Sequence, residues 1–262
     1  GSGDHDTLED LDAGLVALND QGEVFVSGYT KGAVGFGDVS VGGVARYDSF
    51  IVKFDSAGKP LWGKVLSPAK SGAAVAVDAQ GGVVVAGSFS GTLTFGTTML
   101  TAKSTIATYV AKFDKDGNPV WAKSFCETGL CYPGGLKVDS FGDVILTGYF
   151  DQAIDFDDFG EPPYQAEVGT DGFIVKLAGN TGNKGWSHAF GSPSSKDELG
   201  ALAVDTSDNV FVTGKFEVAT TFDGVQFNNS APASRDVLVA KFAQDGAPLW
   251  GKQLAVEASA GV

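Results

Sequence analysis

Residues 74–89, AVAVDAQGGVVVAGSF, and residues 108–125, TYVAKFDKDGNPVWAKSF, decide the fold, because this pair of segments occurs four times. Related pairs begin near Leu15, Leu136 and Ala201. A glycine, a lysine and a tryptophan mark each copy at steps of about 59 to 66 residues, a period typical of repeat proteins. These landmarks are Gly28, Gly87, Gly148 and Gly214, then Lys53, Lys112, Lys176 and Lys241, then Trp62, Trp121, Trp186 and Trp250.

Each copy predicts four short strands, which are rich in β-branched and aromatic residues and are bounded by turn-forming residues. In the second copy the predicted strands are 74–78, 83–87, 108–113 and 119–125. The links at 78–82 and 114–118 are short and contain glycine, so the strands on either side are antiparallel neighbours. Runs such as VVVAG are apolar at successive positions, which indicates that both faces of the sheet are covered.

A repeated four-stranded sheet with two covered faces is typical of a β-propeller blade, and propellers have four to eight blades. The sequence therefore predicts an all-β protein with one β-propeller domain over residues 1–262. Its blades lie at about 14–66, 73–125, 135–190 and 200–254. A closed four-bladed ring is favoured, because an open arc would leave two apolar blade faces bare. The alternatives are part of a larger ring and a ring completed by a second chain.

The repeat carries the motifs V-D-x-x-G, V-x-G-x-F, D-x-F-I-V-K-F-D and G-x-P-x-W. This set resembles the bacterial SBBP-type β-propeller repeat family, which occurs in secreted and surface proteins of myxobacteria, and its strand order is similar to that of NHL repeats. The resemblance implies a propeller and an extracytoplasmic location, but its motifs specify no chemistry. The sequence departs from the motifs at several turn positions, for example at Asn19, where the other copies have aspartate.

The composition is strongly acidic, with 18 Lys and Arg against 32 Asp and Glu, a formal net charge of −14 and a pI near 4.4. Such a surface repels phosphate backbones and anionic lipids. No apolar run approaches the roughly 18 residues that a membrane-spanning helix needs. We therefore expect neither nucleic acid as a partner nor insertion into a membrane.

The two cysteines, Cys126 and Cys131, lie in one short loop, CETGLC. Their spacing predicts a disulfide if the loop folds back, and a disulfide implies an oxidising compartment. This favours a secreted or cell-surface protein. The alternative is a pair of reduced thiols in a cytosolic protein.

Residue types that recur in every copy are interpreted as structural. The four tryptophans are expected to pack between blades. A phenylalanine within each long loop predicts a small extra hairpin, at Phe36, Phe95, Phe156 and Phe222. Only two histidines are present, His5 and His188, so a positioned imidazole is scarce and we predict no catalytic residue.

Long loops follow the second and fourth strands of the copies, and all these loops emerge at the same rim of the propeller. Binding sites are commonly carried by long loops on a rigid scaffold. Tyrosines there offer an apolar ring and a hydroxyl, which suits stacking on a sugar or anchoring a protein. The alternative is that they pack the rim hairpins. The candidate ligand-binding residues are Tyr29, Tyr132, Tyr149, Asp151, Asp155 and Tyr164.

The loop DQAIDFDDFGE gathers five carboxylates, and calcium takes six to eight oxygen ligands. The candidate calcium ligands are Asp151, Asp155, Asp157, Asp158 and Glu161; the alternative is a solvated acidic face. No other cofactor is expected.

These features together predict a non-enzymatic, secreted or cell-surface binding module that recognises a glycan, as a lectin does, or a protein. Two alternatives stay open: a glycan-cleaving enzyme that uses loop carboxylates, and a passive spacer in a larger extracellular protein. The oligomeric state is not set by the sequence.

Overall fold

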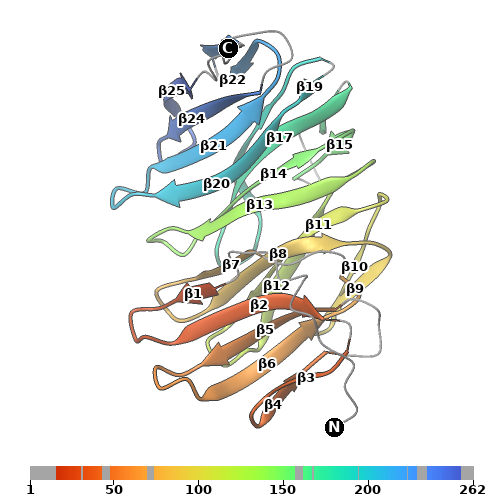
Figure 1. Cartoon of the computed structure of the whole chain (residues 1–262), viewed down its shortest axis with the longest axis vertical. Helices are drawn as coiled ribbons and strands as arrows, with labels where there is room; N and C mark the ends of the chain where they lie inside the picture. The colour runs from red at the N-terminus through yellow and green to blue at the C-terminus, as the bar shows by residue number, and fades with distance from the viewer. Residues whose placement is uncertain are drawn as a thin grey trace, which may run out of the picture.

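The computed structural model describes residues 16–30, 32–42, 48–69, 74–156, 162–166, 168–193, 195–222, 224–228 and 235–254. These residues form an all-β structure, and they contain no helix that could cross a membrane. The strands make four successive antiparallel sheets, which we call blades 1 to 4 (Figure 1).

Each blade is built from four strands in chain order. Blade 1 contains β1 (Val16–Leu18), β2 (Val24–Thr30), β5 (Asp48–Phe54) and β6 (Pro60–Leu66). Blade 2 contains β7 (Ala74–Val77), β8 (Val83–Phe89), β11 (Ala107–Phe113) and β12 (Pro119–Phe125). Blade 3 contains β13 (Cys131–Val138), β14 (Val144–Phe150), β17 (Gly169–Leu177) and β18 (Lys184–Phe190), and β19 (Ser195–Lys196) pairs with β17. Blade 4 contains β20 (Glu198–Val204), β21 (Val210–Phe216), β24 (Asp236–Phe242) and β25 (Pro248–Leu254).

A small hairpin lies between the second and third strands of every blade, as the recurring phenylalanines predicted. In blade 2, Phe95 of this hairpin packs against Phe113 of the blade, with ring centroids 4.8 Å apart. The four hairpins are β3 (Val34–Phe36) with β4 (Val39–Val41), β9 (Thr92–Phe95) with β10 (Thr98–Thr101), β15 (Ala153–Ile154) with β16 (Tyr164–Gln165), and β22 (Thr220–Phe222) with β23 (Val225–Phe227).

The first hairpin turn of each blade is held by the side chain at its start. In blade 2 the Asp78 carboxylate accepts the backbone N–H groups of Gln80 at 3.0 Å and Gly82 at 2.7 Å. Asn19 does the same in blade 1, because its amide oxygen accepts the N–H groups of Gln21 and Glu23. The departure from the repeat motif at Asn19 therefore preserves the turn.

A lysine of the third strand forms an ion pair with this turn. Lys112 lies 2.8 Å from Asp78, Lys176 lies 2.6 Å from Asp139, and the pair recurs in blade 4. In blade 1, where asparagine replaces the aspartate, Lys53 pairs instead with Glu23 at 2.8 Å. Every blade thus keeps a lysine–carboxylate pair beside its first turn.

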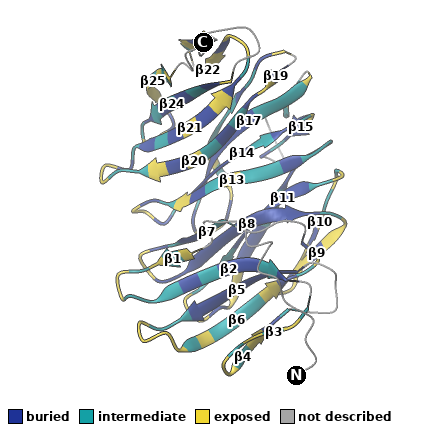
Figure 2. Cartoon of the chain, in the orientation of Figure 1, coloured by how far each residue is buried: buried dark blue, intermediate teal, exposed yellow. Residues whose placement is uncertain are grey.

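Burial differs between the middle and the end of the array. Every residue of β8 is buried, and so is nearly every residue of β11, as expected for a sheet that is covered on both faces. In blade 4 the residues of β21 and β24 alternate between buried and more exposed positions (Figure 2). One face of blade 4 is therefore much less covered than the other.

The blades follow one another in an open arc. β13 of blade 3 packs against β7 of blade 2 and against β20 of blade 4. Figure 1 shows blade 1 and blade 4 at opposite ends of the molecule. The four-stranded antiparallel blades are confirmed, whereas the closed four-bladed ring is not.

The predicted disulfide between Cys126 and Cys131 is present, with an S–S distance of 2.00 Å. It lies where the chain passes from blade 2 into β13. Because it closes a loop of only a few residues, it fixes this crossing between blades and leaves the strands themselves to be held by packing.

Candidate functional site

Two of the predicted tyrosines meet at the rim that carries the long loops. Tyr132 in β13 and Tyr149 in β14 are direct cross-strand partners, and their ring centroids lie 5.3 Å apart at an interplanar angle of 30°. Both side chains are half-buried. Burial raises the pKa of the Tyr149 hydroxyl, and the negative charge of Glu198 raises it further. Tyr149 therefore keeps its proton and is a hydrogen-bond donor at neutral pH.

An open cavity of about 310 Å³ lies beside this pair, between blades 3 and 4. Tyr149, Leu199 and Thr213 line it, together with an ion pair in which Lys215 lies 4.0 Å from Glu198. Two of the lining glycines allow strands to approach closely, because an added Cβ would lie 2.7 Å from the Leu199 carbonyl oxygen at Gly134 and 2.6 Å from the Glu198 carbonyl oxygen at Gly214. We call this cavity with Tyr132 the tyrosine site. It offers an aromatic surface, both signs of charge and a hydroxyl.

The wall that carries Glu198 is fixed by its neighbour Asp197, whose side chain is fully buried. The Asp197 carboxylate accepts hydrogen bonds from the Ser195 hydroxyl at 2.5 Å, the Ser192 N–H at 2.8 Å and the Glu217 N–H at 3.1 Å. Burial raises the pKa of Asp197, while these hydrogen bonds oppose that shift. The tyrosine site is thus preformed on one side by a satisfied polar cluster.

The other predicted site residues lie elsewhere. The Asp151 carboxylate accepts the N–H of Leu130 at 2.6 Å, so it holds the loop that contains the disulfide. The Tyr164 hydroxyl donates to the Ser187 carbonyl at 2.9 Å and its ring contacts Phe156, as in the rim-packing alternative. Tyr29 lies in β2 of blade 1, two blades away from Tyr149.

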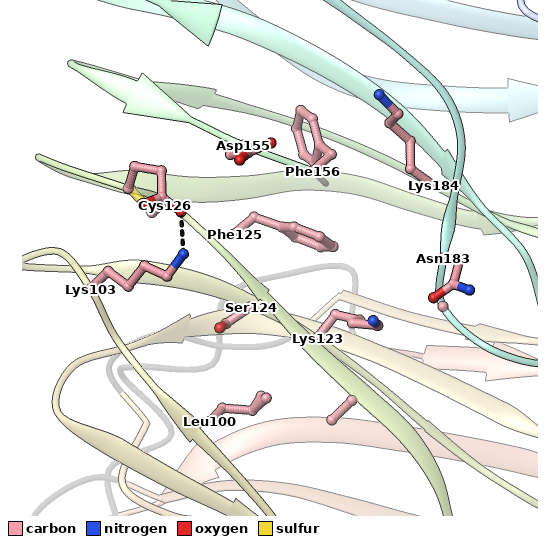
Figure 3. Close-up of a pocket in the computed structure, with 13 residues that line it drawn as sticks. Leu100, Lys103, Lys123, Ser124, Phe125, Cys126, Asp155, Phe156, Asn183 and Lys184 are labelled. Atoms are coloured by element: carbon pink, nitrogen blue, oxygen red, sulfur yellow. Dashed lines mark hydrogen bonds and ion pairs between the residues drawn. The ribbon is translucent and has the colours of Figure 1, made fainter. Parts of the chain in front are cut away.

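Asp155 lines a second cavity of about 470 Å³, which lies between blades 2 and 3 along β12 (Figure 3). Phe125 and Phe156, with ring centroids 5.1 Å apart, form part of its wall. An ion pair of 2.6 Å between Lys103 and Glu127 stands at its edge. Asp155 is therefore not part of the tyrosine site.

A third cavity, of about 500 Å³, lies at the opposite rim between the short loops of blades 1 and 2. Gln80, Trp62 and Lys115 line it. The short-loop rim therefore also carries a cavity. Cavity size alone does not distinguish the two rims.

Three of the predicted calcium ligands, Asp157, Asp158 and Glu161, lie outside the described residues. Within the part of the chain that the structure describes, no three His, Cys, Asp or Glu side chains come together as a metal site. Calcium binding in this loop stays a prediction.

The members of the tyrosine site on blade 4 were not predicted from the sequence, and Glu198 is the one whose charge acts on Tyr149. Glu198 and Tyr149 belong to adjacent blades, and they stand at different positions of the repeat. Comparing the copies position by position does not reveal such a contact. The one signal in the sequence is that Glu198 is an acidic residue at the start of an inner strand and directly follows Asp197.

Comparison with known proteins gives weak but consistent support for the fold. No protein-family model matches the chain. A WD repeat-containing protein of Acanthamoeba polyphaga mimivirus, itself uncharacterized, is 28% identical over 143 residues. The match covers 50% of this chain and 10% of the viral protein. Together with the all-β sheets, it fits a β-propeller type of repeat protein. It does not test the SBBP-type resemblance.

Proposed function

We propose that the chain acts as one propeller-like domain, a non-enzymatic binding module that recognises a protein partner through the tyrosine site. The observation that carries the proposal is the tilted ring pair of Tyr132 and Tyr149 beside an open, preformed cavity. Tyrosines in partly buried, rigid settings are frequent anchors of protein interfaces. The similarity to a WD repeat-containing protein supports the same class of function.

Charge indicates what kind of protein would bind. The chain carries a formal net charge of −14, and Glu198 lies in the cavity. A partner with a basic surface would be attracted over a distance, and an arginine or lysine could pair with Glu198 in place of Lys215. We therefore expect binding to weaken as the salt concentration rises.

A glycan is the second candidate ligand. The half-buried rings of Tyr132 and Tyr149 offer a platform for a sugar ring, and the Thr213 hydroxyl and the Glu198 carboxylate offer polar contacts to its hydroxyls. A cavity of about 310 Å³ is at the small end for ligand sites, so it suits one or two sugar units.

The non-enzymatic assignment is supported by His188. Its ring nitrogen Nε2 lies 2.9 Å from the Gly246 carbonyl oxygen, and its ring stacks on Phe242 with centroids 5.2 Å apart. This histidine is engaged in packing between blades 3 and 4, away from the tyrosine site. The disulfide supports the secreted or cell-surface location that we propose.

The test compares the wild-type chain with the double variant Tyr132→Ala/Tyr149→Ala and the control Gln80→Ala/Lys115→Ala at the opposite rim. Each is immobilised and assayed with extracts of the source organism and with a glycan array. A protein or glycan retained by the wild type and the control, and lost by the tyrosine variant, supports the proposal. Loss with the control alone would contradict it, and release of reducing sugar from a bound glycan would contradict the non-enzymatic assignment.

A further inference from the structure

Consecutive blades are joined by one repeated contact. The outer-strand tryptophan of each of the first three blades donates its indole N–H to a backbone carbonyl in the last hairpin turn of the next blade. The donor–acceptor distances are 3.2 Å from Trp62 to Lys115, 3.0 Å from Trp121 to Gly179 and 3.0 Å from Trp186 to Gln244.

The indole ring also lies against a glycine of that turn. A Cβ added to Gly117, Gly182 or Gly246 would come within 2.6 to 3.0 Å of the ring atoms of the preceding blade's tryptophan. All three glycines have positive φ angles. The contact therefore needs a tryptophan on one blade and a bare glycine turn on the next.

The two ends of the arc present the separate halves of this contact. In blade 4, Trp250 is 39% exposed, and the ring that it meets is Phe211 of its own blade. In blade 1, Gly58 has the same turn conformation, with φ of +81°, and no described atom lies within 4 Å of its Cβ position. One end thus offers the tryptophan and the other offers the glycine turn.

Other side chains at the two ends are also exposed where their counterparts at the joined boundaries are buried. Leu254 is 59% exposed, whereas its counterparts Leu66, Phe125 and Phe190 are buried. At the other end Val16 is 54% exposed, whereas its counterparts Val75, Leu136 and Leu202 are buried.

At each end of the arc these exposed apolar residues lie on the bare face of the blade. Val16 is the cross-strand partner of Val26, which is only partly buried, so both lie on the bare face of blade 1. Trp250 and Leu254 stand four residues apart in β25, so they lie on the same face of blade 4.

We propose that blade 4 of one copy docks on blade 1 of a second copy, in the way that consecutive blades dock within the chain. Trp250 would lie over Gly58 and donate to the carbonyl of Ser56, which stands where Lys115, Gly179 and Gln244 stand in the later blades. A second copy is the partner that fits, because every copy carries both halves. Two copies joined reciprocally form a closed ring of eight blades, the upper end of the usual range. Such a ring leaves neither apolar face bare. It also covers Thr213, Lys215 and Val237, whose counterparts Ala86, Ser88 and Thr108 in blade 2 are buried, so a docked copy and a ligand of the tyrosine site compete for this wall of the cavity.

Sedimentation equilibrium of the wild-type chain over a range of concentrations tests the proposal. The expected mass is twice the 26.9 kDa of the chain, and Trp250→Ala and Leu254→Glu should be monomeric. Leu249→Glu is the matched control on the same strand. Leu249 is 51% exposed, but its counterparts Leu61 and Val120 are also exposed within the array, so this variant should remain dimeric. A wild type that is monomeric at all concentrations, or a dimer that survives Trp250→Ala, overturns the proposal.

The direction of docking is tested by mixing. Gly58→Asn fills the space that Trp250 would occupy, and asparagine tolerates positive φ. Gly58→Asn and Trp250→Ala should each be monomeric alone, with circular dichroism spectra like that of the wild type. Mixed in equal amounts, they should form a heterodimer through the one intact face on each. If either variant dimerises alone, or if the mixture stays monomeric, head-to-tail docking is wrong.

Discussion

The residue at the start of the first hairpin turn both caps the turn and, as an aspartate, pairs with the third-strand lysine. In blade 4 the pKa of Asp205 is lowered to about 2 by the Asn209 side chain, by the backbone N–H groups of Asn209 and Ser207, and by Lys241. A carboxylate with a lower pKa in the folded protein stabilises the fold above its unfolded pKa of about 3.8. This stabilisation is lost as the pH falls from about 4 towards 2.

Replacing Asp205 by asparagine is expected to keep the turn, as Asn19 does in blade 1, and to remove the charge. The melting temperature of Asp205→Asn should lie below that of the wild type at pH 7, and the gap should close as the pH falls below 4. Thermal melts followed by circular dichroism between pH 7 and pH 2.5 check this. The exposed Asp20→Asn variant should have the melting temperature of the wild type at each pH. A difference in melting temperature between Asp205→Asn and the wild type that stays constant with pH would contradict the proposed coupling between stability and the protonation of Asp205.

Asn19 also shows what sequence comparison can predict at this scale. The repeat located the turn correctly, and asparagine retains the acceptor oxygen that the turn needs. The replacement of the lost charge by Glu23 was not predicted. It depends on the hairpin register, which brings the Glu23 side chain within 2.6 Å of the Asn19 amide and 2.8 Å of Lys53.

Among the structural elements, the last hairpin turn of each blade depends most on its neighbour. Gly117→Ala is expected to destabilise the protein by about 1–3 kcal/mol more than Gly58→Ala does. Both glycines have φ near +80°, so an alanine is strained equally at the two positions. Only at Gly117 does a tryptophan ring, that of Trp62, lie where the new methyl group would be. Urea denaturation at low protein concentration measures the difference. Equal losses of unfolding free energy would show that the indole contact contributes little.

The strands and hairpins were largely predictable, whereas the site was not. Predicted strands such as 119–125 match β12 because turn residues and apolar runs fix them locally. Tyr132 and Tyr149 contact each other because they are cross-strand partners, a pairing that follows from the β-bulge between Pro133 and Leu136 in β13. Glu198 lines the same cavity from the next blade. Tyr29 stands at the position of Tyr149 in another blade, and equivalent positions are kept apart by the stacking of blades. Comparison of the repeats therefore grouped Tyr29 with Tyr149, although these two residues do not contact each other.

For the molecule as a whole, an array in which each blade contacts its neighbours should be most stable in its middle. Hydrogen exchange should be slowest in β8 and β11, which are buried throughout, and faster in β25 than in its counterpart β12. Mass spectrometry of exchanged peptides at low protein concentration tests this. Equal protection of β12 and β25 under these conditions would contradict a free end at blade 4.

Ring closure was the property that the repeat could not predict. Four copies fix the number of sheets, but the curvature of the arc depends on the angle at which each blade docks on the next. That angle is set by contacts between side chains of different blades, such as Trp121 with the turn at Gly182. These contacts look the same in a closed ring and in an open arc.

The placement of the tryptophans has a spectroscopic consequence. The chain contains four of them, one in the outer strand of each blade; three lie at joined boundaries, and Trp250 lies at the free end. Indole fluorescence shifts to longer wavelength in contact with water, and Trp250 is 39% exposed whereas Trp121 is buried. Covering the end of blade 4 should therefore move the emission of the unlabelled protein to shorter wavelength, and the Trp250→Ala variant should lack this shift.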